Sequence, residues 1–339
     1  MESRDVFTGL RERARNNPKK IILVEGQDDR VVEAARIILK EEIARLIIFD
    51  AGLLKKVFRK ELGAGYLELV DVTRGTVINK YASLYFELRK SKGVDLDMAK
   101  KMLMDNPVYI AALMVKEGIA DGFVAGASLT TRDVARAAIH CIGKKNDTST
   151  ILGIFIMSIP DSEYGEKGTF VFADCAVLPQ PDRDQLADIA VLSADFTKDI
   201  LKIAPRVAML SYSSKGSGSS ERTGPITEAV RIAASRRPDL LIDGELQVDA
   251  AIVPEVAKTK APDSPVAGFA NVLVFPNLEA ANCSYKLVQR LAKARAVGPI
   301  FLGLGRPASD LSRGCNVEDI VDAVAVTVVR AQENADGRR

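Results

Sequence analysis

Short apolar runs alternate with amphipathic segments along the first 145 residues. The runs are rich in β-branched side chains and end at Gly or Asp, which is typical of buried strands; they are IILVEG (21–26), RLIIFD (45–50) and DGFVAGA (121–127). Between the first two runs, Val31, Ala35 and Ile38 recur at helical spacing. This alternation predicts βαβ units, and therefore an α/β fold whose sheets are mostly parallel, with helices on both faces.

A long apolar segment follows, DMAKKMLMDNPVYIAALMVKEG (97–118), with Pro107 inside it. Proline has no backbone N–H, and its ring clashes with the preceding helical turn. We therefore expect two shorter helices separated at Pro107 instead of one long helix.

The pattern changes near residue 148. Two consecutive apolar runs, TSTILGIFIM (148–157) and GTFVFADCAV (168–177), are joined by a polar turn, which indicates an antiparallel pair. Strand and helix then alternate again up to a last strand, GPIFLGL (298–304), and a helix at 317–332. Because 339 residues exceed the size at which one core usually stops growing, two α/β domains are expected.

Charge is nearly balanced, with 47 Lys and Arg against 45 Asp and Glu and a formal net charge of +2. This balance does not favour nucleic acid or a membrane surface as a partner, so an anionic ligand would need a local cluster of basic side chains. The charged N-terminal segment lacks the apolar core of a signal peptide, and no apolar run approaches the roughly 18 residues of a membrane helix. These features predict a cytoplasmic protein.

Cysteine and histidine usage narrows the chemistry. Cys141, Cys175, Cys283 and Cys315 are scattered without a C-x-x-C pair, so neither disulfides nor a metal site is expected. The single histidine, His140, lies near the end of a predicted helix, where a structural role is the favoured interpretation. An enzyme with one such histidine is expected to use a carboxylate as its proton acceptor.

A Ser/Gly-rich loop, SYSSKGSGSSERTG (211–224), joins a predicted strand to a helix. Its backbone N–H groups, with Lys215 and Arg222, could hold a phosphate group. The loop lacks the G-x-x-x-x-G-K-[ST] pattern of a P-loop, and a mobile surface loop fits its composition equally well. Both interpretations stay open.

The stretch GRPASDLSRGCNVEDIV (305–321) precedes the last predicted helix. Asn316, followed three residues later by Asp319, predicts a capping box. The buried stripe of the helix would then consist of Val317, Ile320, Val321, Val324 and Val328. The same helix start could also bind an anion through its N–H groups and Arg313, with Ser312 and Asp319 beside it. The two interpretations are compatible.

Several long segments occur in order along the chain. They are ADGFVAGASLTT (120–131), VFADCAV (171–177), MLSYSSKGSG (209–218), PDLLIDGELQVDAAIVPEVA (238–257), SPVAGFANVLVFPNLEAANCSYKLVQRLAKA (264–294), GPIFLGL (298–304) and DLSRGCNVEDIV (310–321). Together they resemble the phosphate acetyltransferases (phosphotransacetylases) of the phosphate acetyl/butyryltransferase family. The resemblance covers residues from about 20 to 332.

This resemblance implies two α/β domains with the active-site cleft between them, usually in a homodimer. The end of the chain would return to the first domain. The first domain is therefore expected at 1–146 plus 298–339, and the second at 147–297.

The resemblance also implies a reaction, the reversible transfer of an acetyl group between phosphate and coenzyme A. The substrates would be acetyl phosphate, acetyl-CoA, coenzyme A and phosphate, with no tightly bound cofactor and no metal. Asp319 would take the proton from the coenzyme A thiol, Arg313 would hold the phosphoryl group, and Ser312 would hydrogen-bond the developing oxyanion. Further substrate-binding positions match Arg89, Arg136, Ser128, Thr130, Thr131 and Lys286.

Three alternatives stay open at this stage. Cys315 could carry the acyl group covalently, because it lies near an arginine and a helix start. The acyl group could be propionyl or butyryl instead of acetyl. Finally, the chain could be a non-catalytic acyl-CoA or metabolite-binding module, like the similar domains appended to malic enzymes.

Overall fold

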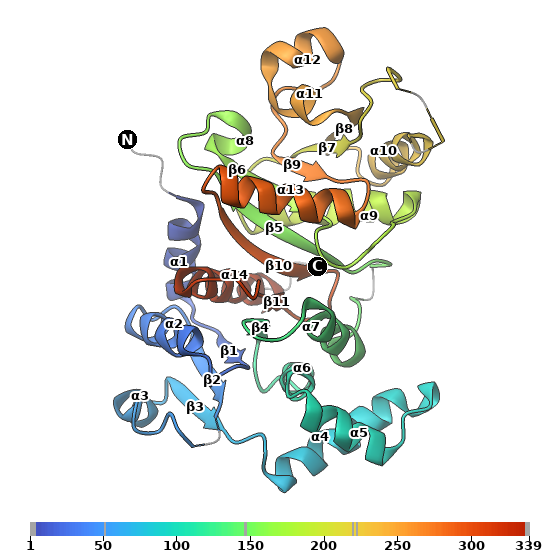
Figure 1. The fold of residues 1–339 in the computed structure, drawn as a ribbon. Helices are drawn as coiled ribbons and strands as arrows, with labels where there is room; N and C mark the ends of the chain where they lie inside the picture. Colours follow the sequence, from blue (N-terminus) through green and yellow to red (C-terminus); the bar gives the residue numbers. More distant parts are fainter. Residues whose placement is uncertain (1–4, 51, 146–147, 219, 222, 336–339) are drawn as a thin grey trace. The chain divides into compact units, whose positions relative to one another are not determined.

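The computed structural model describes residues 5–50, 52–145, 148–218, 220–221 and 223–335. The chain divides into two compact units (Figure 1). We call Phe7–Asn146 with Leu304–Arg339 the terminal unit, and Asp147–Gly303 with Met1–Val6 the inserted unit. Each unit contains a sheet flanked by helices, so the predicted α/β fold class is confirmed.

The sheet of the terminal unit is parallel throughout, in the order β3-β2-β1-β4-β11. Its strands are β1 (Lys20–Leu23), β2 (Arg45–Phe49), β3 (Leu67–Val70), β4 (Gly122–Ala125) and β11 (Ala308–Asp310). Its helices are α1 (Val6–Asn16), α2 (Asp29–Lys40), α3 (Arg59–Gly63), α4 (Gly75–Arg89), α5 (Leu96–Asp105), α6 (Val108–Lys116), α7 (Thr131–Ala137) and α14 (Val317–Ala335), with a 3₁₀ turn η1 (Lys90–Lys92) and a π-helical turn η2 (Ala138–Ile142). Helices α5 and α6 lie on either side of Pro107, as its missing N–H predicts.

Helix α14 is the central buried helix of the terminal unit. Four members of its predicted apolar stripe, from Ile320 to Val328, are fully buried, whereas Val317 in the first turn is only partly buried. Helix α1 lies beside α14 in Figure 1, and Arg11 of α1 donates to Asp322 of α14 at 2.7 Å. The N-terminal helix α1 and the C-terminal helix α14 are therefore joined within the terminal unit.

The sheet of the inserted unit is mixed, in the order β10-β5-β6-β9-β7-β8. Its strands are β5 (Leu152–Ser158), β6 (Thr169–Ala173), β7 (Arg206–Leu210), β8 (Leu241–Leu246), β9 (Val272–Val274) and β10 (Arg295–Leu302). β5 pairs antiparallel with β6 and with β10, while β6, β9, β7 and β8 are parallel. The antiparallel pair predicted after residue 148 is confirmed.

Strand β10 belongs to the inserted unit because Arg295 to Leu302 pair with Ser158 to Leu152 of β5. The division between the units therefore falls between Gly303 and Leu304, six residues after the expected return at 298. The helices of the inserted unit are α8 (Tyr164–Lys167), α9 (Arg183–Asp199), α10 (Gly224–Arg236), α11 (Val248–Ile252), α12 (Pro254–Lys260) and α13 (Leu278–Leu291). They cover a core that includes stacked Phe155 and Tyr285, with ring centroids 4.0 Å apart.

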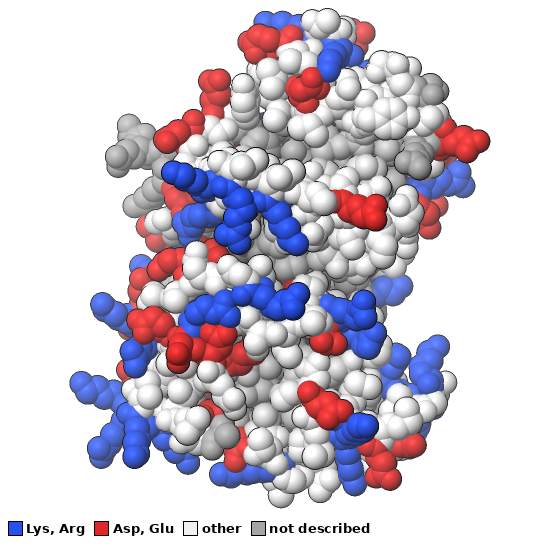
Figure 2. Space-filling view, in the orientation of Figure 1, with Lys and Arg blue, Asp and Glu red and all other residues white. Residues whose placement is uncertain are grey.

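Surface charge agrees with the balanced composition. On the face drawn in Figure 2, Lys and Arg side chains are interspersed with Asp and Glu over both units. Within the described ranges, no helix combines the length and the apolar character required to cross a bilayer.

Candidate active site

Three loops leave the same edge of the parallel sheet in the terminal unit. β1 and β11 both pair with β4, with Leu23 opposite Val124 and Asp310 opposite Ala125. The loops that follow these strands therefore leave the sheet side by side; they comprise residues 24–28, 126–130 and 311–316. Ligands of open parallel sheets bind at this carboxyl edge, so these loops form the candidate site.

Arg30, at the start of α2, links the three loops through hydrogen bonds. Its Nη2 donates to Ala127 O at 2.8 Å, and its Nη1 donates to Arg313 O and Cys315 O at 2.9 Å each. Asp28 orients the guanidinium through Oδ1 and Oδ2, at 3.0 Å from Nε and 2.7 Å from Nη2. The side-chain hydrogen bond from Arg30 lowers the pKa of Asp28. Sequence reasoning missed Arg30, because Asp28 followed by Arg30 reads as an ordinary capped helix start.

Glu25 gives the β4 loop its shape. Its Oε1 accepts the backbone N–H groups of Gly126, Ser128 and Leu129 at 2.8, 3.2 and 3.3 Å. Burial raises the pKa of Glu25 despite these three donors. The carboxyl group of Glu25 therefore fixes the backbone conformation of the loop between β4 and α7.

The start of α14 has the predicted capping box. Asn316 N donates to Asp319 Oδ2, and Asp319 N donates to Asn316 Oδ1, both at 2.9 Å. Asp319 is only 8% exposed, while Ser312 is partly buried and accepts the N–H of Gly314 at 3.3 Å. Arg313 is exposed, and its carbonyl is held by Arg30. The structure thus brings Ser312, Arg313 and Asp319 together around one helix start.

Asp310 lies directly beneath these loops and was not predicted as a site residue. It is fully buried, and neither carboxyl oxygen has a hydrogen-bond partner among the described residues. Burial raises its pKa to about 8; Thr131, the Leu311 N–H and Arg313 are close enough to oppose this rise in part, although none makes a hydrogen bond of standard geometry to the carboxyl group. Gly126 makes room for it, because a Cβ at this position (φ +108°) would lie 2.0 Å from Asp310 Oδ1.

The predicted residues of the β4 loop have defined local roles. Thr130 caps α7: its hydroxyl accepts Asp133 N–H at 3.2 Å and donates to Asp133 Oδ2 at 2.7 Å. Thr131 begins α7 beside Asp310. Ser128 is exposed and borders a cavity of about 490 Å³, which Glu25, Asp28, Asp50 and Thr73 also line.

Arg89 and Arg136, predicted from different segments, converge on His140. Arg89 Nη2 lies 3.5 Å from His140 Nε2, and Tyr85 Oη lies 3.0 Å from Nδ1. Burial and the two arginines lower the pKa of His140, so the imidazole is neutral at pH 7. Arg89 Nε is buried and has no partner within the part of the chain that the structure describes.

The remaining predicted residue, Lys286, lies on α13 of the inserted unit, exposed, with Nζ 5.8 Å from the ring centroid of Tyr285. The Ser/Gly-rich loop of the same unit is tied to β8: Gly216 N donates to Glu245 Oε1 at 2.7 Å, and Lys215 pairs with Asp243. Because carboxylates already occupy these donors, the phosphate-cradle interpretation loses support. Arg222 lies outside the described residues.

The thiol nearest to the candidate site is poorly suited to nucleophilic attack. Cys315 is buried, and this burial raises its pKa to about 11. Among the residues with described placement, no group of three or more His, Cys, Asp or Glu side chains is arranged to hold a metal ion.

The terminal unit thus has a parallel sheet, and Arg30 holds together the loops that follow the C-terminal ends of its strands. Such a fold and site are suited to anionic ligands. The family model of the phosphate acetyl/butaryl transferases matches residues 5–328, and the chain belongs to this family. It is therefore an acyltransferase, as the resemblance predicted.

Similar proteins agree with this assignment over nearly the whole chain. The phosphate acetyltransferase of Thermoanaerobacterium thermosaccharolyticum is 48% identical over 96% of this chain and 99% of its own length. That of Clostridium acetobutylicum is 46% identical over 97% and 99%. The crystal structure of a phosphotransacetylase from Streptococcus pyogenes superimposes with a TM-score of 0.87 at 40% identity, covering 98% of this chain and 100% of that one.

Proposed function

We propose that this protein transfers an acetyl group reversibly between phosphate and coenzyme A. The relatives that are 46–48% identical over almost their entire length are phosphate acetyltransferases, which supports acetyl as the acyl group. The structural observation that carries the proposal is the convergence of Ser312, Arg313 and the Asp319 capping box at the carboxyl edge of β1, β4 and β11.

In the proposed reaction, Asp319 removes the proton from the coenzyme A thiol. The thiolate attacks the carbonyl carbon of acetyl phosphate, the carbonyl oxygen takes the negative charge, and phosphate leaves with the electrons of the broken C–O bond. Ser312 donates to the developing oxyanion, and Arg313 forms a charge-assisted contact with the phosphoryl oxygens. Asp319 is proposed as the base because its carboxyl group is largely buried at the start of α14, in the same loop-to-helix segment as Ser312 and Arg313.

A free carboxyl with a pKa near 3.9 faces a thiol near 8.5, a difference of about 4.6 units or roughly 6 kcal/mol. Arg313 and the positive N-terminal end of α14 reduce this difference by favouring the thiolate. The remaining predicted positions serve binding in this proposal. Arg89, Arg136, Ser128, Thr130, Thr131 and Lys286 would contact the phosphate groups and the coenzyme.

Direct attack is preferred over a covalent acyl-enzyme. A thiol with a pKa of about 11 is almost entirely protonated at neutral pH, which argues against Cys315 as the acyl carrier.

The experiment is the thioester absorbance that develops when purified protein is mixed with coenzyme A and acetyl, propionyl or butyryl phosphate. The highest kcat/KM is expected for acetyl phosphate. A higher kcat/KM for butyryl phosphate would contradict the acetyl assignment, and no thioester from any acyl phosphate would contradict catalysis and favour a binding module.

A further inference from the structure

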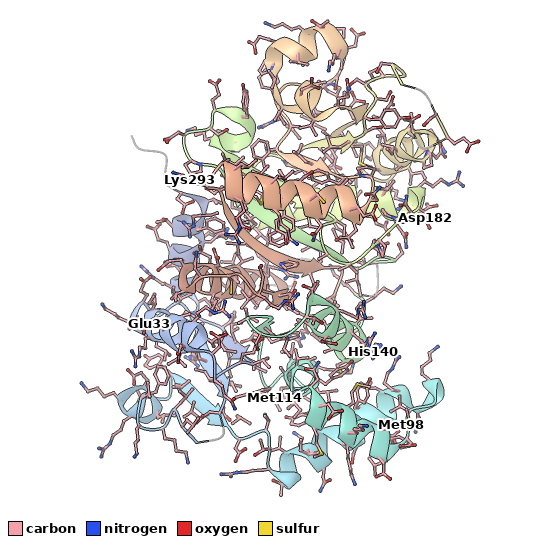
Figure 3. All side chains as sticks on the ribbon, viewed as in Figure 1. Glu33, Met98, Met114, His140, Asp182 and Lys293 are labelled. Atoms are coloured by element: carbon pink, nitrogen blue, oxygen red, sulfur yellow. The ribbon has the colours of Figure 1, made fainter. Side chains whose placement is uncertain are left out.

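The single histidine of the sequence, His140, is packed near a helix end, and it also contacts an arginine that the proposed function assigns to substrate binding. His140 lies in the π-helical turn that follows α7 (labelled in Figure 3), one helical turn after Arg136. Its ring stacks on Tyr85, with centroids 6.4 Å apart at 25°, and meets Tyr109 edge-on at 6.3 Å. These contacts fix the plane of the imidazole.

The hydrogen bonds identify which ring nitrogen carries the proton. An arginine side chain has donors and no acceptor, so the Arg89 Nη2 that lies 3.5 Å from Nε2 requires Nε2 to accept. A neutral imidazole then carries its proton on Nδ1, which donates to Tyr85 Oη at 3.0 Å. The opposite tautomer would place two donors against each other.

The groups that face the ring keep it uncharged. They are Tyr85 and Arg89 on α4, Tyr109 on α6, Arg136 on α7, and the neighbouring Cys141. Burial raises the pKa of both tyrosines and of Cys141, so these three groups are neutral at pH 7. The charge facing the imidazole is therefore the positive charge of two guanidinium groups, which opposes its protonation.

Arg89 has a buried donor that is suited to an anion. Its Nε is buried and unpaired among the described side chains, and a buried unpaired donor on a charged group is costly. A phosphate oxyanion would satisfy this donor.

We propose that His140 is a positioning residue: its neutral imidazole accepts from Arg89 Nη2 and orients the remaining N–H groups of Arg89 toward a phosphate oxyanion of a substrate. This role deepens the proposed function, on which it rests, because Arg89 is assigned there to substrate binding. The oxyanion belongs either to acetyl phosphate or to a phosphate group of coenzyme A.

The first test needs no turnover, so it is independent of the proposed function. Since His140 is the only histidine, ¹⁵N NMR of histidine-labelled protein reports one imidazole. We expect the Nδ1–H tautomer at pH 7.5, a pKa below the ordinary 6.5, and a shift of the Nε2 resonance when inorganic phosphate is added. An Nε2–H tautomer, or a resonance unmoved by saturating phosphate, would overturn the proposal.

The second test uses kinetics at pH 7.5. His140→Gln keeps an acceptor and should leave every KM within about threefold, whereas His140→Ala should raise one KM about tenfold with little change in kcat. Acetyl phosphate and coenzyme A are varied separately, and dephospho-coenzyme A identifies a contact with the coenzyme's 3′-phosphate. The matched control is Tyr109→Phe, which keeps the neighbouring ring and should leave KM unchanged. Equal losses in the Gln and Ala variants, or an unchanged KM in His140→Ala, would refute positioning by an acceptor.

The pH profile separates orientation from simple charge. A protonated His140 would add positive charge near the anion and strengthen binding if charge alone mattered. If the residue orients Arg89, protonation removes the acceptor and weakens binding instead. We expect the kcat/KM ratio of parent to His140→Gln to fall between pH 7.5 and 5.5, because substrate titration cancels in this ratio. A rising ratio, or a constant ratio across the pH range in which NMR shows His140 becoming protonated, would refute the orienting role.

Discussion

Asp319 has two functions in our interpretation, as a helix cap and as a general base, and the structure allows them to be separated. In Asp319→Asn the side-chain oxygen can still accept the Asn316 N–H that now lies 2.9 Å away, while the amide cannot take a proton. In Asn316→Ala the base remains, but the acceptor for Asp319 N–H is lost. Asp319→Asn therefore removes the base and keeps the capping box, whereas Asn316→Ala keeps the base and removes one of the two capping hydrogen bonds.

The magnitudes differ enough to be decisive. Loss of an N-cap side chain costs about 1 kcal/mol, which lowers Tm by roughly 2–4 °C for a unit of this size. Loss of a general base lowers kcat by about 10²–10⁴-fold. We therefore expect Asp319→Asn to lose activity with little change in Tm, and Asn316→Ala to lose stability while keeping a kcat within a fewfold of the parent.

The assays are thioester formation under saturating substrates and thermal unfolding followed by circular dichroism. The base role is refuted if Asp319→Asn unfolds at the parent's temperature and turns over at the parent's rate. If Asn316→Ala instead loses as much kcat as Asp319→Asn, the cap geometry rather than the proton acceptor limits the reaction.

Three further outcomes are expected. The pKa of Asp310 is about 8 in the folded protein and near 3.9 in the unfolded chain, so the parent loses stability as pH rises from about 4 to 8. The free energy of unfolding of Asp310→Asn, measured with denaturant at pH 5 and pH 8, should therefore rise relative to that of the parent by roughly 1 kcal/mol per pH unit. A difference that stays constant with pH would contradict an ionisable, buried Asp310. Arg30→Ala removes the donors to Ala127, Arg313 and Cys315, so urea unfolding should show about 2 kcal/mol less stability and kinetics a higher KM for acetyl phosphate; an unchanged KM would mean that the loops hold their geometry without Arg30. Cys315→Ala should stay active, and mass spectrometry of quenched parent enzyme should detect no acetylated Cys315, whose trapping would instead restore the covalent route.

Local patterns predicted much of the fold. The break at Pro107, the antiparallel pair after residue 148 and the capping box at Asn316 each depend on residues close in sequence, where chain geometry decides the outcome. The division between Gly303 and Leu304 depends on the pairing of β10 with β5, about 140 residues earlier, which no local pattern reveals.

The residues of the candidate site also fall into those that the sequence predicted and those that it did not. The resemblance supplied Ser312, Arg313 and Asp319, which the structure places around one helix start. It did not supply Arg30, whose backbone acceptors lie 97 to 285 residues away, or Asp310, whose burial depends on the space left by Gly126. The contacts of Arg89 and Tyr85 with the two nitrogens of His140 could not be predicted either, because no local pattern brings these residues together.

The order of synthesis gives the split terminal unit a particular vulnerability. When the ribosome has added residue 303, the inserted unit has all six of its strands, but the β4 edge still lacks β11, and the apolar surface that α14 will cover is bare. At about 5–20 residues per second this exposure lasts roughly 10–40 s after residue 146 has been added, which is long enough for a nascent chain to aggregate without a chaperone. A chain whose translation stops before β11 would therefore have all the strands of the inserted unit, an open sheet edge at β4 and no 311–316 loop of the candidate site.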